Sequence, residues 1–394
     1  MADDVVILGG VRTAIGKFGG ALRSHTAVEL GAQAISEGVK RAGVSPQSVD
    51  LCVMGNARQA GNGPNPGRLM AVGAGLPTAA PASTTQQACL SGLLAVIHGR
   101  YAILQGDAEL VVAGGSENMS GVPYLSFETR WGARMGHASL VDGMFKDGFI
   151  DPLTGKHMGE LCDALARRYK IGRDEQDAFA LSSQERAVLA RKNGHLDAML
   201  VPVPAKGASA PPISDDEHVR PDTTLEKLAK LPPAFGKEGT ITAGNASGIT
   251  DGACALVLAA AERARALGVK PRARILGAAT AAVAPEDYPV APVVSTRKLL
   301  DRLGMKASQM DLVEINEAFA AMVLACMRDL GLAPDRVNLW GGAIALGHPI
   351  GMSGARILLY LLHELEATGG RYGLATLCGN GGNGASIMIE RIPS

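Results

Sequence analysis

Three residues in polar or glycine-rich surroundings carry the side chains best suited to chemistry. Cys89 stands in TTQQACLSGLLAV, between a polar run and an apolar run that predicts a helix. A cysteine there is either a small buried hydrophobe or a nucleophile, because the start of a helix stabilises a thiolate. His348 lies in GGAIALGHPIGMSGAR, and Cys378 opens CGNGGNG. A thiol beside an imidazole attacks thioesters readily, and a second thiol can act as a base on a C–H bond.

Metal binding, proteolysis and nucleotide binding use similar residues. No pair of ligands has zinc-like spacing, and a cysteine protease gives Cys378 no role. The run CGNGGNG contains G-x-G-x-x-G at Gly379, Gly381 and Gly384, but the strand-like ASIMIER follows it where a dinucleotide fingerprint needs a helix. We therefore expect these glycines to let a backbone approach something beside Cys378 closely.

An amide forms the fourth candidate. The run EINEAFAA (314–321) places Asn316 at the end of a predicted strand that leads into a helix. Two roles fit this position: a cap for the helix, or an amide that positions a water or an oxyanion donor.

Strand-like and helix-like segments alternate at both ends of the chain, which predicts an α/β fold built in layers. We expect strands at 5–10, 50–55, 109–115, 273–279, 311–316, 372–378 and 385–391, and helices at 27–42, after Pro66, from Cys89, and at 295–304, 317–330 and 351–368.

The two ends of the sequence resemble each other. Asp50 in SVDLCVMGNA matches Asp311 in QMDLVEINEA at an offset of 311 − 50 = 261, and Ser91 matches Ser353 at 353 − 91 = 262. Two matches nearly in register predict a duplicated α/β half. Because equivalent helix starts can face each other across a two-fold centre, Cys89 and His348 are expected to meet there, together with Cys378.

The predicted organisation follows from this duplication. Residues 1–116 form the N-terminal half, completed by about 250–268, and residues 269–394 form the C-terminal half. The stretch 117–249 is richer in loops, prolines and charge, as in KGASAPPISDDEHVRPDTT. It is expected to be either an inserted loop domain that covers a site on the scaffold or a solvated linker.

Composition excludes several classes of function. Lysine plus arginine equals aspartate plus glutamate, at 38 each among 394 residues, which argues against nucleic acid as a partner. No run approaches 18 apolar residues and the first residues lack a basic segment, so neither a membrane span nor an export signal is expected. The six cysteines include no C-x-x-C and are expected to be reduced, which predicts a cytoplasmic location.

Long segments of the chain resemble the thiolase family, in order and nearly from end to end. The segments that carry the resemblance are VRTAIGKFGGAL, QACLSG, GGSENMSGVPY, HMGE, GTITAGNASGITDGA, NEAFAA, GGAIALGHPIGMSGAR and the glycine-rich run after Cys378. The chain looks most like the bacterial acetyl-CoA acetyltransferases of that family, which also contains the 3-ketoacyl-CoA thiolases. The resemblance implies duplicated βαβαβαββ halves in a five-layer α-β-α-β-α arrangement.

The resemblance also implies a catalytic role for each candidate. Cys89 would carry the acyl group, and His348 would take the Cys89 proton and help to hold the thioester oxygen. Cys378 would abstract the α-proton of acetyl-CoA, and Asn316 would fix a water in one oxyanion hole. The backbone N–H groups of Cys89 and Asn380 would form the second.

Coenzyme A would lie under the inserted segment. Ser247 and Ala243 would flank the pantetheine, and Arg220 would lie toward the nucleotide. The channel would be lined by His157, Met158, Phe235, Ala318, Phe319 and Phe149. No metal and no permanently bound cofactor is implied. The partners would be acetyl-CoA, CoA and 3-ketoacyl-CoA, in a homo-oligomer that is a tetramer or a dimer.

The chain departs from the family pattern at three places. Asn380 replaces the middle residue of Cys-x-Gly-Gly-Gly, where a side chain would crowd the acyl pocket or strain the backbone. The run GELCDALA puts Cys162 and Asp163 near the substrate loop, and Thr250 replaces an asparagine. These departures affect the expected acyl-chain preference. Asn380 also favours an alternative function, that of a non-catalytic acyl-CoA-binding homologue. A decarboxylating enzyme of the ketoacyl-synthase type is the other alternative, and Cys378 argues against it.

Overall fold

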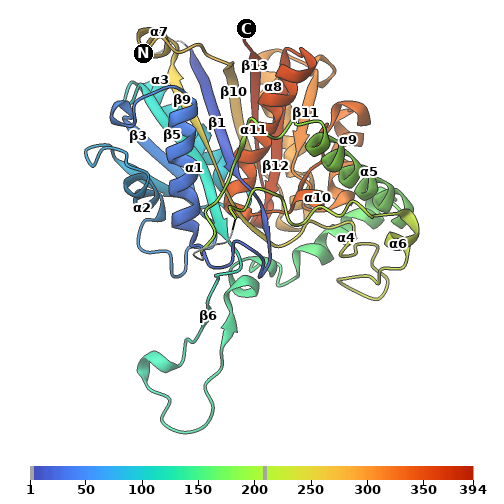
Figure 1. Ribbon diagram of the computed structural model, residues 1–394. Helices are drawn as coiled ribbons and strands as arrows, with labels where there is room; N and C mark the ends of the chain where they lie inside the picture. The colour runs from blue at the N-terminus through green and yellow to red at the C-terminus, as the bar shows by residue number, and fades with distance from the viewer. Residues whose placement is uncertain (1–3, 207–210, 394) are drawn as a thin grey trace.

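The computed structural model describes residues 4–206 and 211–393 as five packed layers. In Figure 1 the N-terminal half (blue to cyan) and the C-terminal half (orange to red) lie side by side, and both chain ends are near the top. Helices α1 and α2 cover the sheet of the N-terminal half, α3 and α11 lie between the two halves, and α8 and α9 cover the outer face of the second sheet. This is the predicted five-layer arrangement. The bounds are α1 (Ala27–Arg41), α2 (Pro66–Gly73), α3 (Ser91–Gln105), α8 (Ala291–Leu303), α9 (Ala320–Leu330) and α11 (Ile350–Thr368).

The strands of the two halves follow the same plan. Their order is β4-β3-β5-β9-β1 in one half and β10-β13-β12-β11 in the other, and a short antiparallel contact of β1 with β10, at Val6–Arg274 and Ile7–Ala273, joins them. The bounds are β1 (Val5–Thr13), β3 (Leu51–Gly55), β4 (Ala82–Thr85), β5 (Leu110–Asn118), β9 (Thr250–Ala260), β10 (Ala273–Ala282), β11 (Leu312–Ile315), β12 (Tyr372–Gly379) and β13 (Asn383–Arg391).

The two matched aspartates make matching hydrogen bonds. Asp50 Oδ2 accepts from the N–H groups of Glu109 and Leu110, both at 2.9 Å, where β5 begins. Asp311 Oδ2 accepts from the N–H groups of 371–372, at 2.7 and 2.8 Å, where β12 begins. The predicted duplication is therefore confirmed in three dimensions. In each half one aspartate carboxylate, Asp50 or Asp311, connects the start of one parallel strand to the start of its neighbour.

Glycines let the central helices touch backbone to backbone. A Cβ added to Gly92 of α3 would lie 2.7 Å from Gly351 O, and one added to Gly354 of α11 would lie 2.5 Å from Leu93 N. Such distances are too short for carbon against a backbone atom, so only glycine permits this crossing. Because the contact is within the first turns, it brings the N-terminal ends of α3 and α11 together.

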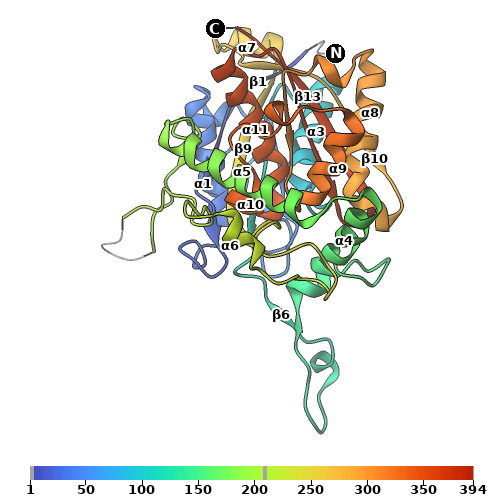
Figure 2. The ribbon, with the colours of Figure 1, turned by 90° about the vertical axis from the view of Figure 1, so that its right-hand side faces the viewer.

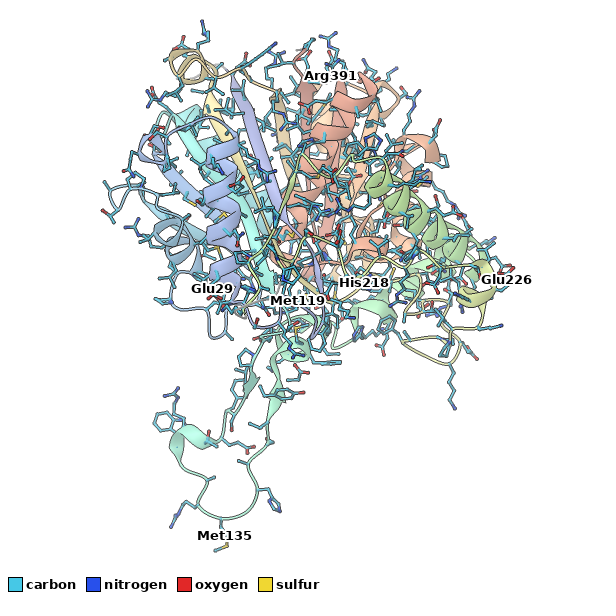
Figure 3. The ribbon with its side chains drawn as sticks, viewed as in Figure 1. Glu29, Met119, Met135, His218, Glu226 and Arg391 are labelled. Atoms are coloured by element: carbon cyan, nitrogen blue, oxygen red, sulfur yellow. The ribbon has the colours of Figure 1, made fainter. Side chains whose placement is uncertain are left out.

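The segment between β5 and β9 contains both helices and loops. Helices α4 and α5 pack against α9 and α10 of the C-terminal half, while the hairpin of β6 and β7 projects away from the body (Figures 1 and 2). Met135, at the tip of this hairpin, is 97% exposed (Figure 3). The bounds are β6 (Tyr124–Leu125), β7 (Val141–Asp142), α4 (Met158–Tyr169), α5 (Arg173–Lys192), β8 (Leu200–Val201) and α6 (Leu225–Ala229), and outside this segment β2 (Gly16–Lys17), α7 (Ala261–Ala266) and α10 (Ala343–Leu346).

Most sequence-predicted elements are present, with shifted ends. The helix expected from Cys89 begins at Ser91, and the helix expected at 317–330 begins at Ala320. One 18-residue window, Ala88–Gln105, is long and apolar enough to cross a membrane. That window coincides with α3, which lies in the central layer of this fold and is mostly buried there.

Candidate functional site

Both halves and the inserted segment line one cavity of about 340 Å³. Cys89 reaches it from the turn before α3, His348 from the loop before α11, and Cys378 from the end of β12. The predicted convergence of these three side chains on one cavity is therefore observed. The other predicted residues that line it are Asn380, Ser247, Ala243, His157, Met158, Phe235, Ala318, Phe319 and Phe149.

Cys89 stands on a strained turn. Ala88 has a left-handed φ of +49°, which is unfavourable for a residue with a side chain. Ser91 holds the turn, because its hydroxyl donates to Ala88 O at 2.7 Å and accepts from Gln87 N at 2.9 Å. The turn lifts Cys89 out of the helix and presents it to the cavity.

The hydrogen bonds around His348 fix its tautomer. Ser353 Oγ donates to Pro349 O at 2.9 Å and lies 2.6 Å from His348 Nδ1. Because the single hydroxyl proton is used on the carbonyl, Nδ1–H must donate to Oγ, and Nε2 is left with its lone pair. Nε2 is buried and has no hydrogen-bond partner among the described residues. His348 is therefore arranged as a proton acceptor.

Burial keeps both reactive groups neutral. It raises the pKa of the Cys89 thiol to about 11, although the nearby Arg58 guanidinium acts in the opposite direction. Burial also lowers the pKa of His348 to about 3, and the positive charges of Arg356 and Arg58 add to that effect. Burial therefore acts against the thiolate that a helix start would stabilise.

Cys378 lies against the turn that carries Cys89. A Cβ added to the adjacent Gly379 would lie 2.0 Å from Leu90 Cδ1, so any side chain at the strand end would displace the Leu90 side chain of this turn. Burial, followed by the neighbouring Cys89, raises the pKa of the Cys378 thiol well above its usual value. The close approach expected for these glycines is therefore observed at Gly379.

Asn316 does not cap a helix. Helix α9 begins later, at Ala320, and its N-terminus has no side-chain cap. The Asn316 amide is fully buried, and neither its oxygen nor its nitrogen has a hydrogen-bond partner among the described residues. Asn316 is also not among the residues that line the cavity. A buried amide without partners is costly, which favours the second of the two roles considered for it.

Asn380 fits its position without strain. The φ angle of Asn380 is not left-handed, whereas the next two residues, Gly381 and Gly382, have φ values of +76° and +85°. Its side chain donates from Nδ2 to Gly148 O, at 3.2 Å, in the inserted segment. The expected backbone strain is therefore absent, and the side chain joins the Cys378 loop to the segment that covers it.

Aromatic rings form the wall of the channel. The His157 ring stacks on Phe235 with 4.4 Å between ring centroids, and the centroid of the Phe149 ring lies 5.8 Å from that of His157. Phe319 meets Phe235 edge to face at 6.0 Å. His157 Nδ1 also accepts from Gly159 N and caps α4, so this ring is fixed in place. The wall suits an uncharged chain such as an acyl or pantetheine group.

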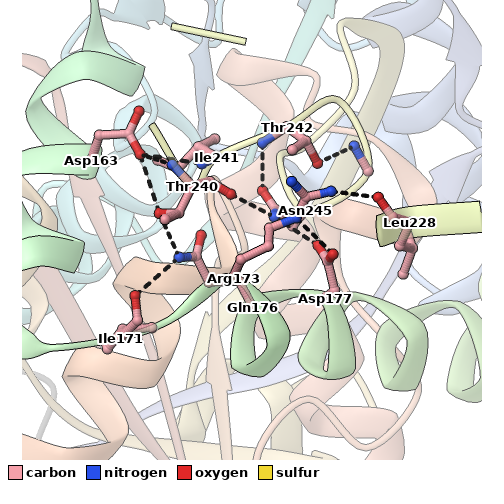
Figure 4. A network of polar contacts seen from close by, with 11 residues as sticks. Asp163, Ile171, Arg173, Gln176, Asp177, Leu228, Thr240, Ile241, Thr242 and Asn245 are labelled. Carbon is pink, nitrogen blue, oxygen red and sulfur yellow. Dashed lines mark hydrogen bonds and ion pairs between the residues drawn. The ribbon is translucent and has the colours of Figure 1, made fainter. Parts of the chain in front are cut away.

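Polar contacts fix the loop that carries Ala243 and Ser247 (Figure 4). Asp163 Oδ1, on α4, accepts from the N–H groups of 240–241 at 2.8 and 3.1 Å. Asn245 Nδ2 donates to Asp177 Oδ1, on α5, at 2.9 Å. The inserted helices therefore hold one side of the cavity, and Asp163, one of the departures from the family pattern, has a positioning role.

Other residues singled out in the sequence, like Asn316, lie outside the cavity. Arg220 lines a neighbouring cleft of about 460 Å³, and Ile249 borders both spaces. Cys162 is fully buried and does not reach the cavity. Thr250 packs behind the His348 loop, because a Cβ added to Gly347 would lie 2.2 Å from Thr250 Cγ2.

Sequence reasoning missed Arg58. This side chain lines the cavity and is only 4% exposed. Its signal in the sequence is weak, because Arg58 lies three residues beyond a strand in a loop without a motif. Only its neighbours in the fold, Ala88 and Cys89, make it part of the site.

Comparison with known proteins agrees with this geometry. The family model "Thiolase, N-terminal domain" matches residues 5–262 and "Thiolase, C-terminal domain" matches residues 269–391. The chain is 47% identical to acetyl-CoA acetyltransferases of Chromobacterium violaceum and Pseudomonas aeruginosa, over 98% and 99% of this chain and 100% of each relative. The crystal structure of the Bacillus anthracis acetyl-CoA acetyltransferase superposes with a TM-score of 0.97 at 42% identity, over 99% of both chains.

Proposed function

The chain belongs to the thiolase family, and from this premise we propose that it condenses two acetyl-CoA molecules to acetoacetyl-CoA and catalyses the reverse, CoA-dependent thiolysis of 3-ketoacyl-CoA. The observation that carries the proposal is the convergence of Cys89, His348 and Cys378 on one cavity with an apolar channel. Coenzyme A thioesters are substrates here, and the proposal includes no resident cofactor or metal.

The first half-reaction acylates Cys89. As the thiol attacks the thioester carbonyl, its proton passes to Nε2 of His348, the C–S bond to CoA breaks, and the proton leaves on the CoA thiol. Because both groups are neutral at rest, proton transfer accompanies the attack and does not precede it. The N–H groups of Cys89 and Asn380 and a water held by Asn316 are the proposed donors to the oxyanions that form, and one such donor is typically worth about 3–4 kcal/mol.

The second half-reaction forms the carbon–carbon bond. The proton of the Cys378 thiol passes to Nε2 of His348, and the resulting thiolate takes the α-proton of a second acetyl-CoA, whose carbanion attacks the acyl carbon on Cys89. The C–S bond to Cys89 then breaks, and the proton returns to that sulfur.

The ketoacyl-synthase alternative is not favoured. Cys378 lines the cavity, and His157, the other histidine in its lining, caps α4 through Nδ1. The non-catalytic alternative rested on Asn380, whose backbone is not strained.

The direct test is acylation. Incubation with acetyl-CoA and mass spectrometry of the peptides should find the acetyl group on Cys89. Cys378→Ala should still acylate Cys89 but form no acetoacetyl-CoA. A folded protein without a labelled peptide contradicts the proposal, and normal condensation by Cys378→Ala contradicts the assignment of the base.

We further propose a cytoplasmic homo-oligomer, a tetramer or a dimer, that works in fatty acid metabolism. The projecting hairpin supports self-association, because Trp131 and Met135 are 88% and 97% exposed. We also propose that Arg220, which lines the cleft beside Ile249, contacts the nucleotide end of CoA. Light scattering after size-exclusion chromatography tests the assembly, and Trp131→Ser should lower its mass if the hairpin mediates contacts.

A further inference from the structure

Arg58 is a buried cation that the mechanism above does not use. Its side chain is 4% exposed and lines the same cavity as Cys89. Nη1 donates to the backbone carbonyl of Asp147 at 2.7 Å, whereas Nε is buried without a hydrogen-bond partner among the described residues. The charge of Arg58 acts on the nearby buried Glu117, where it opposes the rise in the pKa of that carboxyl. Burying a charged group without a direct ion-pair partner is nevertheless unfavourable, so such a residue needs another explanation.

No carboxylate within the described residues forms an ion pair with Arg58. The nearby Glu117 accepts from the N–H groups of Ala57, Arg58 and Gly351 and from the Asn56 amide, so its oxygens are used by uncharged donors. Asp147 offers Arg58 its backbone carbonyl and not its carboxylate. The guanidinium therefore retains donors for a negatively charged partner at the cavity wall.

A second hollow, of about 790 Å³, adjoins the catalytic cavity at this wall. Arg58, Ala88 and Asn380 line both spaces. In contrast to the aromatic channel, the second hollow includes charged and amide side chains, namely Gln59, Gln86, Gln87, Lys146, Asp147 and Asn383, beside the apolar Ala57, Ala60, Val122 and Pro152. An acyl chain with a polar end therefore finds hydrogen-bonding partners there that the aromatic channel does not offer.

We propose that Arg58 is a specificity-determining residue that binds the terminal carboxylate of a short acyl chain carried on Cys89. This inference rests on the proposed function and names a substrate class for it: 3-oxoacyl-CoA thioesters whose acyl chain ends in a carboxylate. A guanidinium fork matches a carboxylate with two parallel hydrogen bonds, which gives strong selectivity for that group.

The reaction balances without a further reagent. Cys89 attacks the C3 carbonyl of 3-oxohexanedioyl-CoA, the C2–C3 bond breaks, and the C2 carbanion takes a proton from Cys378 and leaves as acetyl-CoA. The acyl group left on Cys89 is 3-carboxypropanoyl, whose carboxylate faces Arg58. A CoA thiol then takes this group from Cys89 as the corresponding thioester, and its proton restores the enzyme.

The test compares two substrates of equal length in the full-length protein: 3-oxohexanoyl-CoA and 3-oxohexanedioyl-CoA. We expect the wild-type kcat/KM to be about tenfold or more higher for the carboxylate substrate, and Arg58→Gln to lower the ratio of the two kcat/KM values about 100-fold, because the buried carboxylate then lacks its partner. Arg297→Gln is the matched control, since it removes another arginine–carbonyl hydrogen bond, to Asp329 O, outside the cavity. Its ratio should equal that of the wild type.

A wild-type measurement covers the case in which Arg58→Gln does not fold. Acylation of Cys89 by 3-carboxypropanoyl-CoA should be at least about tenfold faster than acylation by its terminal methyl ester, which has no charge. Equal rates overturn the inference. An equal loss on both six-carbon substrates in Arg58→Gln also overturns it, because Arg58 then only supports the 145–149 segment. If the wild type cleaves acetoacetyl-CoA, the proposed function holds, and either of these outcomes contradicts only the role of Arg58.

Discussion

The two corners that precede the central helices are built alike and differ in chemistry. Ser91 in one corner and Ser353 in the other are counterparts, 262 positions apart (353 − 91). Each donates its hydroxyl proton to a backbone carbonyl of the preceding turn. Ser91 accepts from the backbone N–H of Gln87, whereas Ser353 accepts from the ring nitrogen Nδ1 of His348. The same scaffold thus holds a backbone turn in one half and an imidazole tautomer in the other.

The position equivalent to Cys89 shows why only one corner carries a nucleophile. That position is Gly351 (89 + 262), which donates its N–H to Glu117 at 2.9 Å. A Cβ on Gly351 would lie 2.7 Å from Ser116 O, so a side chain has no room there. Duplication supplied two helix starts, and close packing restricted one of them to glycine while the other kept a reactive side chain.

The largest effect should come from removing the imidazole. We expect His348→Ala to slow acylation of Cys89 by about 10²- to 10⁴-fold, the usual contribution of a general base. Gln86→Ala is the matched control at the equivalent position (348 − 262), and it should cost less than about tenfold. Rapid-quench measurement of acetyl-enzyme formation gives both rates, and similar losses in the two variants would remove the distinction between the corners.

The pH dependence of thiol reactivity distinguishes neutral groups from an ion pair. Since the Cys89 pKa is raised to about 11 and that of His348 lowered to about 3, the thiolate fraction should increase about tenfold per pH unit from pH 7 to 10. The rate of Cys89 alkylation by iodoacetamide should follow this slope. A rate that is flat above pH 6 would indicate a preformed thiolate–imidazolium pair instead.

The hydroxyls of the matched serines, Ser353 and Ser91, should differ in their effect on the rate. Ser353→Ala leaves Nδ1–H of His348 without its acceptor, so we expect acylation to slow about 10- to 100-fold, which corresponds to about 1.5–3 kcal/mol. Ser91→Ala should lower the rate less, because a turn and not a proton acceptor is loosened. Thermal denaturation of both variants separates loss of fold from loss of rate, and equal rate losses at equal stability would contradict the different roles of the hydroxyls.

The smallest effect is expected at the contact between α3 and α11. Gly354→Ala places a Cβ against the backbone of Leu93, and we expect it to lower the free energy of unfolding by about 1–3 kcal/mol through overpacking. At Gly172, where a Cβ meets nothing within 4 Å, alanine should change the stability by less than about 0.5 kcal/mol. Urea denaturation measures both, and an unchanged Gly354→Ala would show that the helices can separate without loss.

Much of the fold could be predicted from the sequence, because its signals are local or repeated. Alternating apolar runs identified the strands, and the repeat of Asp50 and Ser91 at Asp311 and Ser353 predicted the duplication. Helix starts were less exact: α9 begins at Ala320 and not at 317, since Phe319 pairs with Ala246 in an antiparallel β-bridge.

The candidate site was predictable only in part. Reactive types at loop–helix junctions pointed to Cys89, His348 and Cys378, whereas Arg58 carries no local signal. The protonation states of Cys89 and His348 also could not be predicted from the sequence, because desolvation depends on what surrounds a thiol and an imidazole in space.

The sequence by itself determined the types of reactive group, the strand and helix periods and the two-fold plan, since each is written in neighbouring residues. The tertiary structure alone decided the neutral state of Cys89 and His348, the place of Asn380 against Gly148, and the position in the cavity wall of the Arg58 guanidinium, which forms no ion pair among the described residues. The physical reason is that burial and hydrogen-bond partners arise from segments far apart in the chain, and no local pattern specifies which of those segments will meet.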